Sequence, residues 1–229
     1  MVDERIRTLN HFAMFSFNDV YWSLSSEERH KLGETWHAGL RQAAQRVDVY
    51  QVFPARTDAD VLVWSVVPAE QNCDAAGFFE RFAQAINPHR LFMRPTLTLW
   101  GFTKPSVYSR GRSAQEIDPF AEERKTYFIL YPFVKTVDWY LMSRDARQGM
   151  MNEHIRTGHQ YLEITQLLLY SFGLQDQEFI VCYETDDLVQ FSDLVTDLRS
   201  SEARRFTERD TPIFTAVYHP VEETLALYQ

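Results

Sequence analysis

The chain repeats one order of expected secondary-structure elements, and this repeat limits the possible folds more than any other feature. In the first half, alternation and helical spacing predict a strand, a helix, two strands, a helix and a strand. These elements are expected at 9–17, 25–45, 47–55, 60–69, 73–87 and 94–102. The helix at 25–45 begins with Ser-Ser-Glu-Glu, a typical N-terminal helix signal. The order β-α-β-β-α-β is that of a ferredoxin-like unit.

The second half is expected to contain the same order of elements. They fall at 125–133, 143–164, 166–172, 178–185, 187–206 and 211–219. The stretch 20–29 also resembles 137–147, with Trp22 matching Trp139 and Leu24 matching Leu141. A repeat of this kind determines the whole fold.

We therefore expect an α+β fold of tandem ferredoxin-like units that form a dimeric α+β barrel-like domain. The expected division is an N-terminal half at 1–105, a linker at 106–124 and a C-terminal half at 125–229. The linker contains Gly, Ser, Pro and mixed charges. Each sheet must bury one face, and joining the two sheets face to face or edge to edge would give one core.

Composition excludes several classes of protein. The 229 residues include 23 basic and 32 acidic side chains, for a net charge of −9, and no basic stripe is visible. Nucleic acid is therefore not an expected partner. No apolar run is long enough to span a bilayer, and the N-terminus lacks a signal-peptide pattern. We expect a soluble, cytoplasmic protein.

Two histidines, His154 and His159, fall within one predicted helix. On a helical wheel, His154 shares an apolar stripe with Met150, Met151, Gly158, Tyr161 and Leu162. Gly158 weakens the helix by roughly 1 kcal/mol relative to Ala, which suggests that something bulky approaches there. A hydrogen-bonded core histidine explains the stripe as well as a metal ligand does. No zinc motif accompanies His154, whereas haem iron needs only one protein ligand.

Several motifs of the second half resemble those of the chlorite dismutase family, and more narrowly its haem-biosynthetic branch, the coproheme decarboxylases. The resemblance runs from about Lys125 to Thr215. It rests on YPFVK, DWYLM, MMNEH, SFGLQDQEF, YETDD, LVTDLRSSEARRF and DTPIF. It implies a fused pair of ferredoxin-like units, a haem or coproheme cofactor, hydrogen peroxide as co-substrate and assembly into a homo-pentamer.

The resemblance also implies roles for residues of the last two long helices. The axial iron ligand of the family falls on His154, which leaves His159 as a bystander. A carboxylate on the last long helix orients the axial imidazole in the family, and Glu202 is the best match. Such a carboxylate fixes the tautomer and makes the imidazole a stronger donor. Arg199 is the expected propionate partner, because an arginine binds a carboxylate in a bidentate manner.

The remaining expected site residues follow from the same resemblance. Gln166 occupies the distal position, where chlorite-degrading members have arginine. A neutral amide cannot stabilise a departing anion by charge, so chlorite is expected to be a poor substrate. Tyr131 and Lys135 match the Tyr-Pro-x-x-Lys motif of the branch, in which the tyrosine supplies the oxidising radical and the lysine lies at a propionate. Trp139 is expected to line the haem site.

Coproheme has four propionates, so more basic partners are expected. Arg110 and Arg112 in the linker are weak candidates.

The sequence thus predicts a peroxide-dependent coproheme decarboxylase that converts coproheme to haem b. A haem peroxidase or weak chlorite dismutase of the same fold is the first alternative, and Gln166 argues against chlorite chemistry. A non-catalytic haem-binding protein is the second alternative. Tyr131 and Lys135 argue against it, because a carrier needs neither.

Overall fold

The computed structural model describes residues 7–69, 74–108 and 113–229, and Arg110 and Arg112 lie outside the described residues. The first half contains β1 (Thr8–Phe17), α1 (Asp19–Trp22), α2 (Ser26–Ala43), β2 (Arg46–Gln51), β3 (Val61–Pro68), α3 (Ala75–Ile86), a 3₁₀ turn η1 (Asn87–His89) and β4 (Met93–Thr103). The second half contains β5 (Tyr127–Lys135), α4 (Val137–Leu141), α5 (Arg144–Gly158), β6 (Thr165–Tyr170), β7 (Phe179–Thr185), α6 (Leu188–Arg199), a 3₁₀ segment η2 (Glu202–Phe206), β8 (Thr207–Arg209), β9 (Phe214–Tyr218) and α7 (Val221–Ala226).

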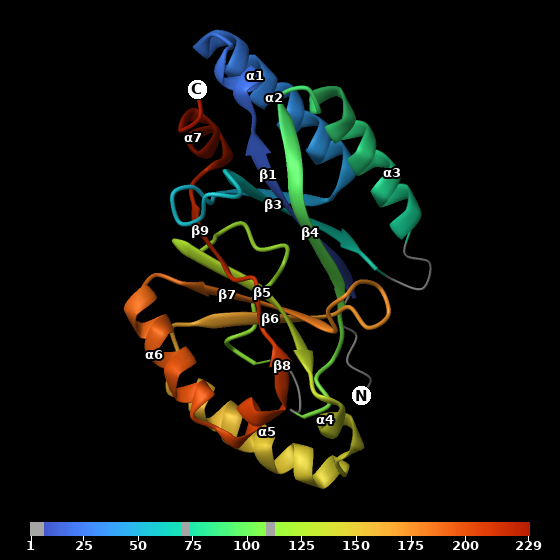
Figure 1. Cartoon of the computed structure of the whole chain (residues 1–229), viewed down its shortest axis with the longest axis vertical. Coiled ribbons are helices and arrows are strands. Elements are labelled where there is room, and N and C mark those ends of the chain that lie inside the picture. The colour runs from blue at the N-terminus through green and yellow to red at the C-terminus, as the bar shows by residue number, and fades with distance from the viewer. Residues whose placement is uncertain (1–6, 70–73, 109–112) are drawn as a thin grey trace.

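The strands of the two halves join edge to edge and close into a barrel. The first half has the strand order β4-β1-β3-β2 and the second has the equivalent order β9-β5-β7-β6, with antiparallel pairing throughout. Pairing of β2 with β9, and of β4 with β6, closes the ring. Figure 1 shows the two halves one above the other, each with its helices on the outside. The predicted α+β fold with ferredoxin-like repeats is confirmed.

Local sequence signals explain why α2 forms where the sequence predicts a helix. The hydroxyl of Ser25 accepts the Glu28 N–H, and the Glu28 carboxylate accepts the Ser25 N–H, so two unpaired donors at the helix start are satisfied. Leu32, Trp36 and Leu40 then recur on the face that packs on the sheet, and all three are buried. Apolar periodicity and the capping box therefore act together.

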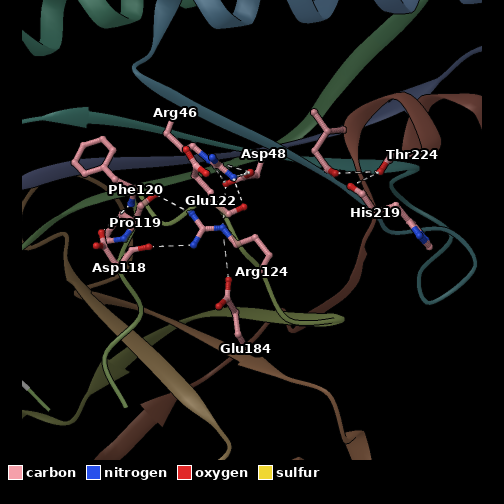
Figure 2. Close-up of polar contacts among 11 residues, drawn as sticks. Arg46, Asp48, Asp118, Pro119, Phe120, Glu122, Arg124, Glu184, His219 and Thr224 are labelled. Carbon is pink, nitrogen blue, oxygen red and sulfur yellow. Dashed lines mark hydrogen bonds and ion pairs between the residues drawn. The ribbon is translucent and has the colours of Figure 1, made fainter. Parts of the chain in front are cut away.

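A buried charge cluster links both halves inside the barrel (Figure 2). The fully buried side chain of Arg124 has its Nε 3.1 Å from Oδ2 of Asp48 on β2 and 3.7 Å from Oε1 of Glu184 on β7. Its terminal nitrogens donate to the carbonyls of Asp118 and Pro119, at 3.0 and 2.8 Å. One guanidinium therefore holds a first-half strand, the linker and a second-half strand together.

The chain end returns to the first half. Leu225 and Tyr228 belong to the apolar core beneath α2, and the Tyr21 hydroxyl donates to the Tyr228 carbonyl at 2.9 Å. The Thr224 hydroxyl donates to the Val49 carbonyl at 3.2 Å. The segment after β9 follows the second half in sequence but packs against the first half.

The outer faces of the two half-sheets are covered differently. In the first half, α2 and α3 pack directly on the sheet, and Trp36 and Phe78 are fully buried. The equivalent helix of the second half, α5, has no buried residue. The matched tryptophans differ as well, since Trp22 is 47% exposed and Trp139 only 4%. The repeat is therefore symmetric in topology and asymmetric in packing. In the described part of the chain, no helix has the length and apolarity that crossing a membrane requires.

The contribution of Glu184 to the free energy of unfolding should fall as pH rises from about 4.5 to 7. Burial raises the pKa of Glu184 from 4.5 to about 7, and Arg124 opposes this only in part. The unfolded carboxyl ionises near 4.5 while the folded one stays protonated up to about 7, so ionisation favours unfolding by up to about 3 kcal/mol. Glu184→Gln, which mimics the protonated form, should raise the melting temperature at pH 8 and change it much less at pH 5.

The matched control is Glu163→Gln, whose side chain is 83% exposed and which should have no effect at either pH. A lower melting temperature for Glu184→Gln at pH 8 would mean that the ion pair with Arg124 outweighs the desolvation of the carboxylate.

Candidate functional site

A cavity of about 1210 Å³ lies between the outer face of the second half-sheet and its helices. Residues of β5, β6 and β7 form one wall, α5 and α6 another, and the stretches 103–108 and 113–116 complete it. Ligand pockets are typically about 300–1,000 Å³, so the space suits a large ligand. The incomplete packing under α5 is what leaves this cavity open.

His154 lies on α5 and lines the cavity. Burial, and then the nearby charge of Lys135, lower the pKa of His154 from 6.5 to about 4, and Glu153 opposes part of this shift. Among the described residues none hydrogen-bonds to its ring, so the hydrogen-bonded core histidine is not what the structure shows. A neutral imidazole with an uncommitted nitrogen can bind a metal.

The described residues contain no group of three or more His, Cys, Asp or Glu side chains that could hold a metal ion. A metal at His154 would therefore need most of its ligands from a prosthetic group. His159 caps the end of α5 and also lines the cavity, but it is exposed.

The predicted helix over 143–164 ends earlier, at Gly158. The amide of Gln115 explains the end, because its Nε2 donates to the carbonyls of Gly158, Tyr161 and Ile164, at 3.3, 2.9 and 3.1 Å. The Gly158 and Tyr161 carbonyls also accept the Tyr161 and Ile164 N–H groups, at 3.1 Å each, so the chain leaves the helix through two turns that the Gln115 amide braces. A Cβ added at Gly158 would meet no atom within 4 Å, so the glycine leaves open space beside His154.

Gln166 lines the cavity. The alternation of residues in the sequence did not show on which face of the strand it lies. Leu167 and Leu169 pack into the barrel core, so Gln166 lies on the opposite face of β6. Its backbone is paired to the linker, with the Gln166 N–H donating to the Gln115 carbonyl at 2.7 Å and the Ile117 N–H donating to the Gln166 carbonyl at 3.0 Å. The linker therefore fixes both the end of α5 and the start of β6.

Tyr131 lines the cavity from β5, next to Tyr183 on the neighbouring strand β7. The two rings stack with centroids 6.1 Å apart. Burial, and then the neighbouring Tyr183, raise the pKa of Tyr131 well above 10. The phenol of Tyr131 therefore keeps its proton at neutral pH.

Lys135 and Trp139 lie together on the same wall. The ammonium of Lys135 is 4.7 Å from the centroid of the Trp139 ring, and it donates to the Thr207 hydroxyl at 3.1 Å. Burial, and then the charge of Arg204, lower the pKa of Lys135 from 10.5 to about 8, and Glu178 opposes part of this shift. The lysine is thus mostly charged at neutral pH yet close to releasing a proton.

Arg199 lines the cavity and shares Asp210 with Arg204, at 3.4 and 2.8 Å. Glu202 lies elsewhere. The predicted helix over 187–206 stops at Arg199, and Glu202 falls in η2, where its exposed carboxylate pairs with Arg205 at 3.3 Å. It does not line the cavity.

The helix ends there because two serines compete for its last carbonyls. The Ser200 hydroxyl donates to the Thr196 carbonyl at 3.1 Å and the Ser201 hydroxyl donates to the Leu198 carbonyl at 2.7 Å.

The cavity is basic although the chain is acidic. Its described lining includes five cationic and only two acidic side chains, in a chain of net charge −9. The cations are Lys104, Lys135, Arg147, Arg199 and Arg204, and the acids are Glu116 and Asp210. A cavity with this excess of positive charge and aromatic walls suits a flat, apolar ligand that carries several anionic groups.

Sequence reasoning missed three residues of this site. Gln115 sits in a linker that gives no periodic signal, and Tyr183 looks like an ordinary strand aromatic. Arg147 looks like a solvated helix charge. Its spacing of two helical turns before His154 could have placed it on the same face.

Comparisons with known proteins assign this architecture. The family model described as Chlorite dismutase matches residues 21–219. The coproheme decarboxylase of Mycolicibacterium smegmatis is 28% identical over 178 residues, which cover 78% of this chain and 75% of that protein. The coproheme decarboxylase of Staphylococcus carnosus is 28% identical over 160 residues, 63% of this chain and 62% of that protein. A mutant chlorite dismutase from Candidatus Nitrospira defluvii superposes with a TM-score of 0.84 at 23% identity, over 96% of this chain and 95% of that one.

The fold and the cavity thus define a closed barrel of two ferredoxin-like units with a large cavity in the second half. The chain belongs to the chlorite dismutase family.

Lys135 should titrate near pH 8 in the unliganded protein, because its ammonium is partly desolvated and lies near Arg204. The check is NMR of protein whose lysines carry ¹³C-methyl groups. One resonance should show a midpoint near pH 8, and it should be missing from Lys135→Met. If all lysine resonances titrated near 10.5, the described environment of Lys135 would be wrong.

Proposed function

We propose that this protein is a coproheme decarboxylase that uses hydrogen peroxide to convert propionates of iron coproporphyrin into vinyl groups. The observation that carries the proposal is the arrangement of one neutral histidine, His154, in a large basic cavity with Tyr131 and Lys135 on its wall. The relatives named coproheme decarboxylase support the same assignment.

The residues of the cavity fit an iron porphyrin. His154 offers a neutral nitrogen, and Gly158 leaves open space beside it. Apolar and aromatic side chains suit the macrocycle, and the cationic side chains suit its carboxylates. His154 would hold the iron, and Lys135 and Arg199 would bind propionates.

The bound iron porphyrin would supply the redox chemistry, and the protein would supply orientation and electrostatics. Each propionate that becomes a vinyl group loses CO₂, a proton and two electrons. One molecule of hydrogen peroxide takes up the two electrons and two protons to form two molecules of water, so one further proton comes from solvent.

Three residues of the cavity wall would each have a separate role in the reaction. Tyr131, once oxidised, would take a hydrogen atom from the propionate chain. Lys135 would hold the propionate carboxylate with its ammonium group. Gln166 would orient peroxide through a neutral amide. Because it carries no charge, it gives little help to a leaving anion, and this disfavours chlorite as a substrate.

The family resemblance suggests the assembly, and the composition and the repeat suggest the location and the division of the chain. We propose a homo-pentamer in the cytoplasm, with the division at 106–124 separating an N-terminal half from the half that binds the porphyrin. We also keep the proposal that Glu202 tunes the axial imidazole, which would require its carboxylate to leave Arg205.

The proposal predicts opposite effects for the two histidines. His154→Ala should abolish the absorption spectrum of a histidine-ligated iron porphyrin, because the neutral imidazole of His154 supplies the axial bond. His159→Ala should leave the spectrum intact, since His159 is an exposed helix cap. The measurement is titration of each variant with ferric coproporphyrin. The reverse pattern would show that His159 is the ligand.

Tyr131→Phe should keep porphyrin binding and lose decarboxylation. Phenylalanine preserves the ring and its stacking on Tyr183, and removes only the oxidisable hydroxyl. The check is mass analysis of the porphyrin after limited peroxide is added to each complex. Wild type should yield haem b, and the variant should retain coproporphyrin. Full conversion by the variant would remove the proposed role of Tyr131, and no conversion by wild type would contradict the proposed function.

A further inference from the structure

Arg147 is a cavity residue whose guanidinium has no polar partner among the residues that the structure describes. It lies on α5 and lines the cavity, and its Nε is buried without any hydrogen-bond partner. No ion pair or side-chain hydrogen bond is recorded for its guanidinium in the described part of the chain. A buried unpaired donor is unfavourable, so such groups in folded proteins need an explanation.

The other cations of the cavity have partners or solvent. Arg199 and Arg204 share the carboxylate of Asp210, and Lys135 donates to Thr207. Lys104 is exposed and lies over the Tyr170 ring. Arg147 therefore differs from the rest, because its charge is partly desolvated and no described residue forms an ion pair with it.

The surrounding groups do not provide that counter-charge. Arg147 lies near Tyr140 and acts against the rise in the pKa of this phenol. The Tyr140 hydroxyl donates to Oε2 of Glu178 at 2.5 Å, and the same oxygen accepts the Lys135 N–H at 2.8 Å. The neighbouring carboxylate is thus already engaged by two donors.

The position of Arg147 on the helix matches the size of a porphyrin. It precedes His154 by seven residues, which is two helical turns or about 10.5 Å along the axis, on the same face. A side chain at that distance from an axial histidine reaches the rim of the macrocycle, where its carboxylates lie. An arginine fork can bind such a carboxylate through two parallel hydrogen bonds.

We infer that Arg147 binds a carboxylate of the ligand and so anchors the porphyrin at the end of the cavity near Tyr140. This inference rests on the proposed function. It assigns a fixed electrostatic partner to a ligand carboxylate in addition to Lys135 and Arg199. Because the Arg147 guanidinium makes no polar contact with the described residues of the unliganded protein, its replacement should not lower the stability of the fold.

The test is the affinity of four proteins for ferric coproporphyrin, measured from the change in the porphyrin absorption spectrum. The proteins are wild type, Arg147→Gln, Arg147→Lys and the control Arg156→Gln, an exposed arginine of the same helix outside the cavity lining. Arg147→Gln should raise Kd by about 10- to 100-fold, the usual effect of losing a hydrogen bond to a charged group. Arg147→Lys should raise it less, and Arg156→Gln should leave it unchanged.

Two further measurements separate a carboxylate contact from packing. The tetramethyl ester of the same porphyrin, kept soluble in mild detergent, should bind wild type and Arg147→Gln equally well. The unliganded melting temperature of Arg147→Gln should be no lower than that of wild type. The inference is wrong if Arg147→Gln binds ferric coproporphyrin within twofold of wild type, or if the ester loses affinity to the same extent. Failure of wild type to bind ferric coproporphyrin at all would instead overturn the proposed function, and with it the inference.

Discussion

Closure of the barrel is the constraint on which the rest of the structure depends. Each ferredoxin-like half ends in two strand edges, and the pairings of β2 with β9 and β4 with β6 remove all four. The inner faces then form one shared apolar core. Arg124 also joins the two halves. Its buried guanidinium pairs with Asp48 of the first half and lies beside Glu184 of the second half. Removing one partner of a buried pair typically costs about 3–5 kcal/mol, so the halves are coupled through this cluster.

The two half-sheets share one core inside the barrel, but they differ in how helices pack on their outer faces. Trp36, Phe78 and their neighbours fill the space under α2 and α3. Under α5 the equivalent space is a cavity, and the helix presents His154 and Arg147 to it. Gln115 of the linker fixes two sides of this cavity. Its side-chain amide binds carbonyls at the end of α5, and its backbone carbonyl accepts the Gln166 N–H. One half thus provides stability while the other keeps an open site.

The sequence was sufficient for features that depend on local pattern, and insufficient for those that depend on distant partners. Alternation and the Ser25 cap predicted the order of elements and the start of α2. Sequence could not choose between face-to-face and edge-to-edge joining, because that depends on strand pairs far apart in the chain. The end of α5 was predicted too late, since Gln115 lies more than forty residues away. Arg147 escaped notice because a charged helix residue normally faces solvent, and only the cavity reveals its desolvation.

The most direct test of this account is a crystal structure of the protein with ferric coproporphyrin. The account predicts the porphyrin in the second-half cavity, with iron bound to His154, one carboxylate at Lys135 beside Tyr131, and another at Arg147. Iron bound to His159, or a porphyrin seated anywhere outside the space between α5, α6 and the second half-sheet, would contradict it.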